Sequence, residues 1–412
     1  MTVPFAATHH DRTFPTLNAV RAVGALMVVC THVAFNTGRI THGWTGAVLS
    51  RLDFGVTLFF ILSGFLLARP FLLSVAREQP TPSWRHYLWK RALRILPLYW
   101  VVVIAAMLLD PANDDATWQD WLSQLTLTQI YRDDLLASSL TQMWSLCTEV
   151  AFYVVLPALV VLLTRTRRRS GLHLPTVFAR VGVLCILGVL WQAWTGTIPG
   201  DRGHYAQWLP GLLPWFLVGV GFAAVSASLA RDPRDQVLDR IAGDLTGCWL
   251  VATAVFAIAC SPIAGPRLLL VPGAWEAALK LVLYGVAGAF YVLPLVFGPE
   301  KEGRTRFWLS GPVPLWLGDI SYGVFAIHML VLNMVFLALD LKVFTGRFLV
   351  VLVLTLGVTV VLAGLSFRFF ESPILRLKNI GPFRRLEPAG IDLGSTASVG
   401  DEGRAGLHAD QA

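Results

Sequence analysis

Charged residues are scarce in this sequence. Asp, Glu, Lys and Arg together make up 14% of its 412 residues, against about a quarter in soluble domains. Hydrophobic residues make up 55%, and the mean hydropathy is +0.61. This composition excludes an ordinary soluble globular protein and indicates a protein that lies in a membrane.

Cysteine is also sparse, and the cysteines are not arranged for cross-linking. The five of them are scattered in or beside apolar runs, with no Cys-x-x-Cys pair: Cys30, Cys147, Cys185, Cys248 and Cys260. This spacing argues against a disulfide framework, a zinc site or an iron–sulfur cluster. We therefore expect small apolar side chains packed between helices, no metal and no tightly bound cofactor.

Long apolar runs are what the chain has in abundance. Ten segments have the length needed to cross a bilayer: 17–36, 54–74, 93–109, 148–164, 177–195, 209–229, 246–262, 276–297, 314–338 and 348–370. They predict an all-α polytopic membrane protein of about ten transmembrane helices around a polar intramembrane cavity.

The flanking segments complete the predicted organisation. Residues 1–16 are polar and the first apolar run carries an arginine, so we expect a retained first span and no cleavable signal peptide. Residues 17–376 form the predicted transmembrane domain. Residues 377–412 are predicted to be a disordered cytoplasmic tail, because their C-terminal part lacks any apolar period.

The distribution of Lys and Arg predicts the orientation. If the N-terminus is cytoplasmic, 24 of the 33 Lys and Arg residues fall in cytoplasmic segments and 8 in outer ones, with Arg21 inside the first span. Because cytoplasmic loops are enriched in these residues, we expect both termini in the cytoplasm. The net charge of +7 then reflects topology, and no nucleic-acid partner is expected.

The first span carries two polar residues on one face. Arg21 and His32 are eleven residues apart, which is three helical turns and about 16 Å along the axis. A cation and an imidazole are costly in lipid. We therefore expect both side chains to face the protein interior or a wet cavity.

Arg91 and Arg94 lie three residues apart at the predicted cytoplasmic surface, where two interpretations are open. They are either positive-inside anchors of the membrane span or a site for an anionic headgroup, since planar guanidinium groups suit phosphate. Glu149, with Tyr153 one turn later, marks the start of the fourth span. An acid there either caps the N-terminus of a helix or belongs to a functional site.

Two further features are weak on their own. Ser321 and His328 share a face of the ninth span, and a helix–helix hydrogen bond is the simpler interpretation of His328. Ser63-Gly64 in the second span indicates close packing against another backbone. Glu371, at the end of the tenth span, is expected to pair with a basic neighbour.

In their order and spacing these pieces resemble one family, the integral membrane acyltransferase family 3, over about residues 12–376. The family includes O-acyltransferases of bacterial surface glycans and of macrolide antibiotics. The motifs that carry the resemblance are Arg21 with His32, Phe59-Phe60-x-x-Ser63-Gly64, Arg91-x-x-Arg94 with Pro97 and Tyr99, Trp144-Ser145-Leu146-x-x-Glu149-x-x-Phe152-Tyr153, Ile320-Ser321-Tyr322 with His328, and Glu371-x-Pro373.

The resemblance implies an acyl-CoA donor, acetyl-CoA for an acetyl group, and a hydroxyl acceptor. The acceptor is a surface polysaccharide, a glycolipid such as lipopolysaccharide, or a small secondary metabolite, and the membrane is the bacterial cytoplasmic membrane. We expect Arg91 and Arg94, with Arg21 deeper, to hold the CoA end.

We further expect His32 to be the general base and Glu149 to orient it at a similar depth, as in a catalytic triad. Ser63 and Tyr153 are candidate oxyanion donors. Trp144, Ser321 and His328 are the remaining candidate substrate-binding residues.

A transporter or flippase is the alternative, because ten spans with buried charge also describe carriers. Carboxylates here cluster at segment ends, and no inverted repeat is visible, which favours the enzyme. Segments 110–147 and 195–208 are expected to build the acceptor-facing surface. The spacing of Trp118, Trp121, Leu122 and Leu125 predicts a short interfacial helix within the first of them.

Overall fold

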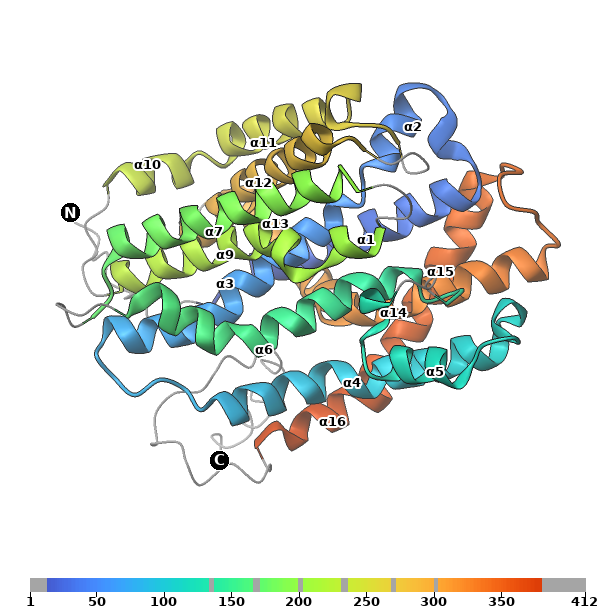
Figure 1. The fold of residues 1–412 in the computed structure, drawn as a ribbon, viewed down its shortest axis with the longest axis horizontal. Coiled ribbons are helices and arrows are strands. Elements are labelled where there is room, and N and C mark those ends of the chain that lie inside the picture. Colours follow the sequence, from blue (N-terminus) through green and yellow to red (C-terminus); the bar gives the residue numbers. More distant parts are fainter. Residues whose placement is uncertain are drawn as a thin grey trace, which may run out of the picture.

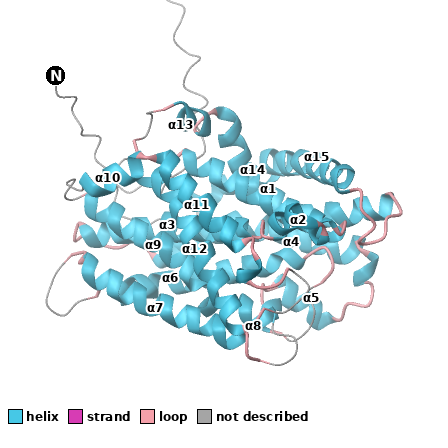
Figure 2. Cartoon of the chain, turned by 90° about the horizontal axis from the view of Figure 1, so that it is seen from above, coloured by secondary structure: helices cyan, strands magenta, loops and turns pink. Residues whose placement is uncertain are grey.

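The structure is a computed structural model that describes residues 13–132, 137–165, 171–198, 203–230, 236–267, 272–299 and 303–379. These residues form helices and connecting loops without any strand (Figure 1, Figure 2). The predictions for residues 1–12 of the N-terminal segment and for residues 380–412 of the tail lie outside the described residues.

The helices follow one another along the chain with short connections. Their bounds are α1 Thr16–Asn36, α2 Gly43–Ser50, α3 Phe54–Ala76, α4 Trp84–Leu109, α5 Trp118–Leu125, α6 Trp144–Thr164, α7 Leu174–Thr195, α8 Gly203–Gln207, α9 Leu209–Leu229, α10 Gln236–Gly243, α11 Leu245–Ala259, α12 Ala274–Phe297, α13 Arg304–Leu309, α14 Pro312–Ala338, α15 Phe348–Ser366 and α16 Ser372–Arg376. A single π-helical turn, Phe367–Glu371, joins α15 to α16.

The predicted polytopic α-helical architecture is confirmed. Within the described residues nine helices are long and apolar enough to cross a bilayer. The seventh predicted segment, 246–262, corresponds to α11, which has 15 residues and is short for a bilayer that needs about 20. Together with α10, from which it is bent by 74°, it makes a tenth candidate span.

Two predicted spans begin too late. The segment predicted as 93–109 is α4, which begins at Trp84, and the one predicted as 148–164 is preceded by a 3₁₀ turn at Thr141–Met143 and begins as α6 at Trp144. Polar residues lower the local hydropathy there, yet they continue the helix. Glu149 therefore lies within a helix, at the second turn, and does not cap its start.

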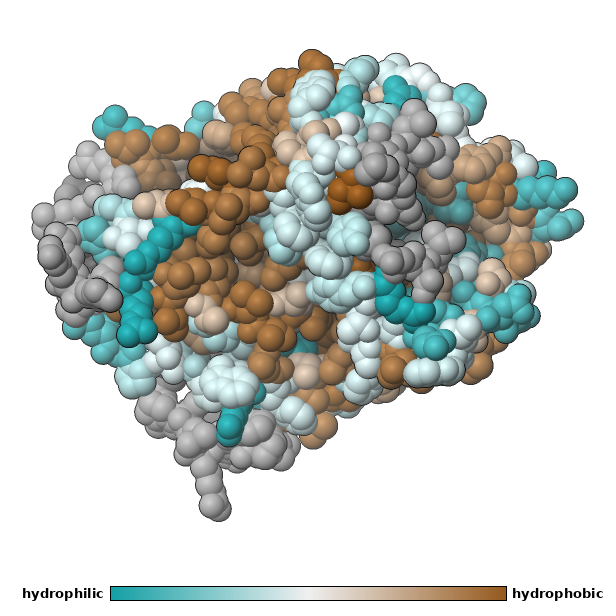
Figure 3. Space-filling model, in the orientation of Figure 1, coloured by the Kyte–Doolittle hydropathy of each residue, from teal (hydrophilic) through white to brown (hydrophobic). Residues whose placement is uncertain are grey.

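Burial differs strongly between the helices and shows which ones form the centre. The most apolar parts of α1, α3 and α9 are mostly buried, whereas only a small share of those of α7 and α15 is buried. The exposed residues of α7 and α15 are apolar, as expected for helices that face lipid. In Figure 3 apolar side chains cover the middle of the visible face, and hydrophilic ones gather towards its left and right ends.

The core of the bundle is a close contact between α3 and α9. A Cβ on Gly64 would overlap the carbonyl oxygen of Phe216, and one on Gly219 would overlap that of Ile61. Glycine at both positions lets the two backbones approach, as is typical of packed membrane helices. The Phe216 ring stacks on Phe60 at a centroid distance of 4.3 Å. The close packing predicted for Ser63-Gly64 is thus confirmed.

A buried hydrogen-bond network anchors the loop that leads into α6. Asp110, directly after α4, accepts hydrogen bonds from the Ser139 hydroxyl at 2.6 Å and from the Asn333 amide of α14 at 3.0 Å. Burial alone would raise the pKa of Asp110, but these bonds and those from Ser138 and the Ala112 N–H hold it below its ordinary value. The network fixes where α6 starts relative to α4 and α14.

The predicted short helix at 118–125 is confirmed as α5. It begins with a capping box, in which Thr117 and Asp120 each accept a hydrogen bond from the other's backbone N–H. It is tied to α4 because the Tyr99 hydroxyl donates to the Gln124 carbonyl and the Trp100 indole donates to the Leu125 carbonyl at 3.0 Å. Segment 110–132 is thereby held against α4.

We expect Gly64→Ala to destabilise the protein by about 1–3 kcal/mol, the usual range for overpacking, because the added methyl group meets the Phe216 backbone. The matched control is Gly357→Ala on α15, where an added Cβ has no neighbour within 4 Å. Thermal unfolding of the purified protein in detergent measures both variants. An unchanged melting temperature for Gly64→Ala would contradict the packing described here.

Candidate active site

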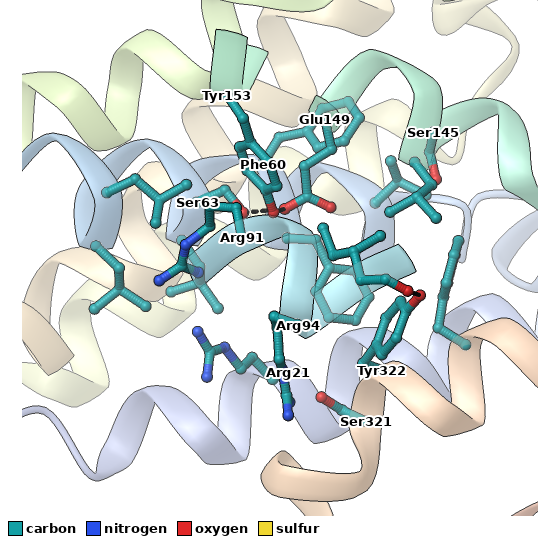
Figure 4. A pocket seen from close by; sticks show the side chains of 18 residues that line it. Arg21, Phe60, Ser63, Arg91, Arg94, Ser145, Glu149, Tyr153, Ser321 and Tyr322 are labelled. Atoms are coloured by element: carbon teal, nitrogen blue, oxygen red, sulfur yellow. Dashed lines mark hydrogen bonds between the residues drawn. The ribbon is translucent and has the colours of Figure 1, made fainter. Parts of the chain in front are cut away.

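A cavity of about 110 Å³ lies where α1, α3, α4, α6 and α14 meet (Figure 4). On the basis of the volume of liquid water it accommodates on the order of three or four water molecules, or a group as small as an acetyl thioester. Its lining consists of Arg21, Val56, Phe59, Phe60, Leu62, Ser63, Leu66, Leu67, Arg91, Arg94, Ile95, Ser145, Leu146, Glu149, Tyr153, Ser321, Tyr322 and Phe325.

Three arginines give the cavity a positive character. Arg21 comes from α1, and Arg91 and Arg94 come from α4, while Glu149 is the one carboxylate among the lining residues. The Nε atom of Arg91 is buried and has no hydrogen-bond partner among the described residues. A buried donor on a cation, left without an acceptor, favours an anionic ligand at this place.

The positive charge of Arg94 is partly neutralised by a carboxylate that does not line the cavity. Its guanidinium lies 3.7 Å from the Glu371 carboxylate and donates to the Asp319 carbonyl at 3.2 Å. The basic neighbour expected for Glu371 is therefore Arg94. The pair joins the start of α4 to the π-helical turn after α15.

Glu149 is held by two hydroxyl groups. The Ser63 hydroxyl of α3 donates to its Oε1, and the Tyr153 hydroxyl donates to the same oxygen at 2.7 Å. In Figure 4 these three side chains meet on one side of the cavity. Because both hydroxyl protons are directed at the carboxylate, neither is offered to an oxyanion in this arrangement, contrary to the expectation for Ser63 and Tyr153.

The structure does not bring Glu149 to His32. The Nδ1 atom of His32 lies 2.9 Å from the Val28 carbonyl oxygen and 3.1 Å from Nε2 of His328. The expected Glu149–His32 contact is wrong, because α6 begins before residue 148 and Glu149 is level with Ser63 in the interior. The simpler interpretation of His328, a hydrogen bond between helices, is confirmed.

The hydrogen-bond partners fix the protonation of the two rings. Nδ1 of His328 faces only carbonyl oxygens, that of Phe325 at 2.7 Å and that of Val324 at 3.2 Å, so it carries the proton and Nε2 is an acceptor. Nδ1 of His32 faces the Val28 carbonyl and this acceptor, so it also carries a proton. In the neutral pair the free lone pair is then on Nε2 of His32.

The remaining predicted residues divide into those at the cavity and those away from it. Ser321 lines the cavity, and its hydroxyl donates to the Gly318 carbonyl at 2.7 Å. His32, His328 and Trp144 are not among the lining residues. Trp144 is partly buried at the first position of α6 and packs against the core.

Sequence reasoning missed two lining residues as site candidates. Ser145 lines the cavity, and Tyr322 lines it while its hydroxyl donates to the Ile95 carbonyl of α4 at 2.7 Å. Both directly follow residues that were singled out, Trp144 and Ser321. The signal was present in the sequence, because both residues stand inside the motifs that carry the family resemblance.

The structure thus combines helices that can span a membrane with a cavity lined by arginines and a pair of hydrogen-bonded histidines next to it. These features define an integral membrane protein whose interior holds groups able to bind an anion and to accept a proton. The chain matches the family described as "Acyltransferase domain" over residues 14–364. It therefore belongs to that family of integral membrane acyltransferases, which confirms the resemblance found in the motifs.

Curated relatives point the same way. The chain is 25% identical to YrhL of Bacillus subtilis (strain 168) over 396 residues, covering 89% of this chain and 56% of that protein. It is 21% identical over 401 residues to the peptidoglycan O-acetyltransferase OatA of Listeria monocytogenes, covering 92% and 58%. It is 26% identical over 337 residues to the acyltransferase MdmB of Streptomyces mycarofaciens, covering 77% and 79%.

The chain thus spans somewhat more than half the length of the first two of these relatives, and most of the third. No solved structure matches the chain. The activity and substrates of the relatives are properties of those proteins, and for this chain they enter only as proposals.

Proposed function

We propose that this protein is a membrane O-acyltransferase of the bacterial cytoplasmic membrane. It moves an acyl group, acetyl in the simplest case, from acyl-CoA to a hydroxyl of a surface glycan, a glycolipid or a small secondary metabolite. The observation that carries the proposal is the joint presence of a cation-lined cavity and an imidazole whose free lone pair is fixed on Nε2, in a chain of the acyltransferase family.

The proposed orientation places both termini in the cytoplasm. It is supported by the excess of Lys and Arg in the segments that would face the cytoplasm. Figure 1 agrees with such an arrangement, since α10 lies at one end of the helix bundle and α2 and α5 lie at the other. The arginines of α4 belong to the half of that helix nearer its N-terminus, and hence to the cytoplasmic side.

The proposed donor site is the cavity. The CoA portion of the donor is an anion, and the residues that line the cavity include three arginines, Arg21, Arg91 and Arg94, and one carboxylate, Glu149. Guanidinium groups form paired, planar hydrogen bonds with phosphate oxygens. The unpartnered Nε of Arg91 is the donor that such a ligand satisfies first.

The proposed chemistry takes place at His32. Nε2 accepts the proton of the acceptor hydroxyl as its oxygen attacks the thioester carbonyl, an oxygen–carbon bond forms, and the carbon–sulfur bond breaks. The proton then passes to the CoA thiolate, so the atoms balance. His328 accepts from Nδ1–H of His32, which keeps the ring in the productive tautomer and helps to spread the positive charge that it gains.

Glu149 has a different role in this scheme from the one that the sequence suggested. It lies with Ser63 and Tyr153 among the arginines, where its charge counters part of theirs. It therefore sets the geometry and net charge of the donor site, and the orientation of the base falls to His328. The acceptor remains a hydroxyl compound defined only by class.

The first test is His32→Ala. We expect acyl transfer to fall by at least about 10²-fold, the lower end of what a positioned general base supplies, while the amount of protein in the membrane stays normal. Purified protein is incubated with labelled acetyl-CoA and acceptor, and released CoA and labelled acceptor are measured. His42→Ala, at the exposed N-cap of α2, is the matched control, and full turnover by His32→Ala would remove the proposal.

The orienting role of His328 is tested by comparing two replacements. His328→Leu removes the acceptor for Nδ1–H of His32, and we expect kcat to fall by about 10–10³-fold with the KM for acyl-CoA unchanged. His328→Gln keeps a side-chain carbonyl that accepts the same hydrogen bond, so its kcat stays well above that of the leucine variant. Equal kcat values for the two variants would contradict this role.

The donor site is tested with Arg91→Ala and Arg94→Ala. Because a charged hydrogen bond contributes about 1.5–3 kcal/mol, we expect the KM for acyl-CoA to rise by about 10- to 100-fold and the KM for the acceptor to change little. Arg85→Ala, an exposed arginine of the same helix, is the control. A similar rise in both KM values would argue against an anion site for the donor.

A further inference from the structure

A pair of phenylalanine rings stands between the arginine cavity and the histidine pair. Phe59 of α3 and Phe325 of α14 both line the cavity, and their rings make an edge-to-face contact with centroids 6.1 Å apart. The Phe325 ring also lies 6.1 Å from the His328 ring. Both rings therefore line the cavity, and the Phe325 ring also contacts the His328 imidazole.

The residue order along α1 shows the same separation. Arg21, Gly24, Val28 and His32 follow one another at intervals of three and four residues, so they share one helix face. A Cβ on Gly24 would lie 3.4 Å from the Phe59 ring, which places this ring on α1 between the arginine and the histidine. The direct line from Arg21 to His32 along the helix is covered by Phe59.

The order along α14 repeats this arrangement. Ser321 lines the cavity, Phe325 follows one turn later and His328 follows less than one turn after that. The three share one face of the helix, and Ser321 and His328 are about 10 Å apart along the axis. Along both helices one aromatic ring thus lies between a residue that lines the cavity and a histidine.

We propose that Phe59 and Phe325 form a size filter for the acyl group, an inference that rests on the function proposed above. A thioester whose CoA end is held by the arginines reaches Nε2 of His32 only if its acyl end passes between the two rings. A planar acetyl group needs a narrow opening, and a branched acyl group needs both rings to move further. The two residues therefore select the donor by the width of its acyl group.

The rings are suited to such movement without loss of the base. Phe325 positions His328 through its backbone carbonyl, which belongs to the helix and stays in place when the side chain rotates. Phe59 is only partly buried and packs against both hydrophobic clusters of the bundle. The Phe325 ring is buried, so it moves together with the side chains around it, whereas the hydrogen bonds of the histidine pair involve neither ring.

The test compares kcat/KM for acetyl-CoA and for isobutyryl-CoA in the full-length purified protein. In Phe59→Leu and in Phe325→Leu we expect the isobutyryl-to-acetyl ratio to rise by at least about tenfold, in line with the discrimination that one or two methyl groups allow in an apolar site. Phe222→Leu is the matched control, since Phe222 of α9 packs edge-to-face on Phe297 of α12 and is not among the residues that line the cavity.

The outcomes separate the filter from the function on which it rests. Wild-type protein that turns over neither thioester overturns the proposed function itself. Wild-type turnover together with an unchanged ratio in both leucine variants overturns the filter alone, and so does an equal rise in Phe222→Leu. If a leucine variant does not reach the membrane, Phe59→Met or Phe325→Met, with similar volume and no ring, is measured against the same ratios.

Discussion

Polar groups inside a bundle of apolar helices need partners on other helices, because no water is at hand to supply them. This constraint organises the centre of the molecule. His32 of α1 finds His328 of α14, Glu149 of α6 finds Ser63 of α3, and Arg94 of α4 finds Glu371 after α15. Each polar pair thus fixes the relative position of two helices, which the apolar pattern alone does not determine. Glu149, Ser63 and Arg94 line the cavity, and the histidine pair lies next to Phe325, which also lines it.

The separation of the arginines from the imidazole has a chemical consequence. A base that accepts a proton becomes a cation, and a guanidinium close to it in a medium of low dielectric constant would oppose that step. Arg21 and His32 are about 16 Å apart along α1, with Gly24 and the Phe59 ring between them. Under the proposed function, the same helix would therefore bind an anion near one end of its polar face and stabilise a developing cation near the other.

Much of this arrangement can be predicted from the sequence, and there is a physical reason why the rest cannot. Helical periodicity places Arg21 and His32 on one face, and small residues at Ser63-Gly64 indicate close packing, because both are local properties of one helix. The partner of His32 lies 296 residues away, and local patterns carry no information on which helix stands opposite. Glu149 was assigned to that place because its span was taken to begin at residue 148. The helix begins at Trp144, and this difference of one turn moves the carboxylate to the arginines.

Phe325 contacts both the histidine pair and the cavity, the first through its backbone and the second through its side chain. Its carbonyl oxygen holds Nδ1–H of His328, and through His328 it determines which nitrogen of His32 is basic. Its ring meets Phe59 at the cavity wall. In the proposed mechanism, the orientation of the base depends on the backbone of this residue and the admission of the donor depends on its ring, so the two do not interfere. Under the same proposal, selection among donors is confined to the step that precedes proton transfer.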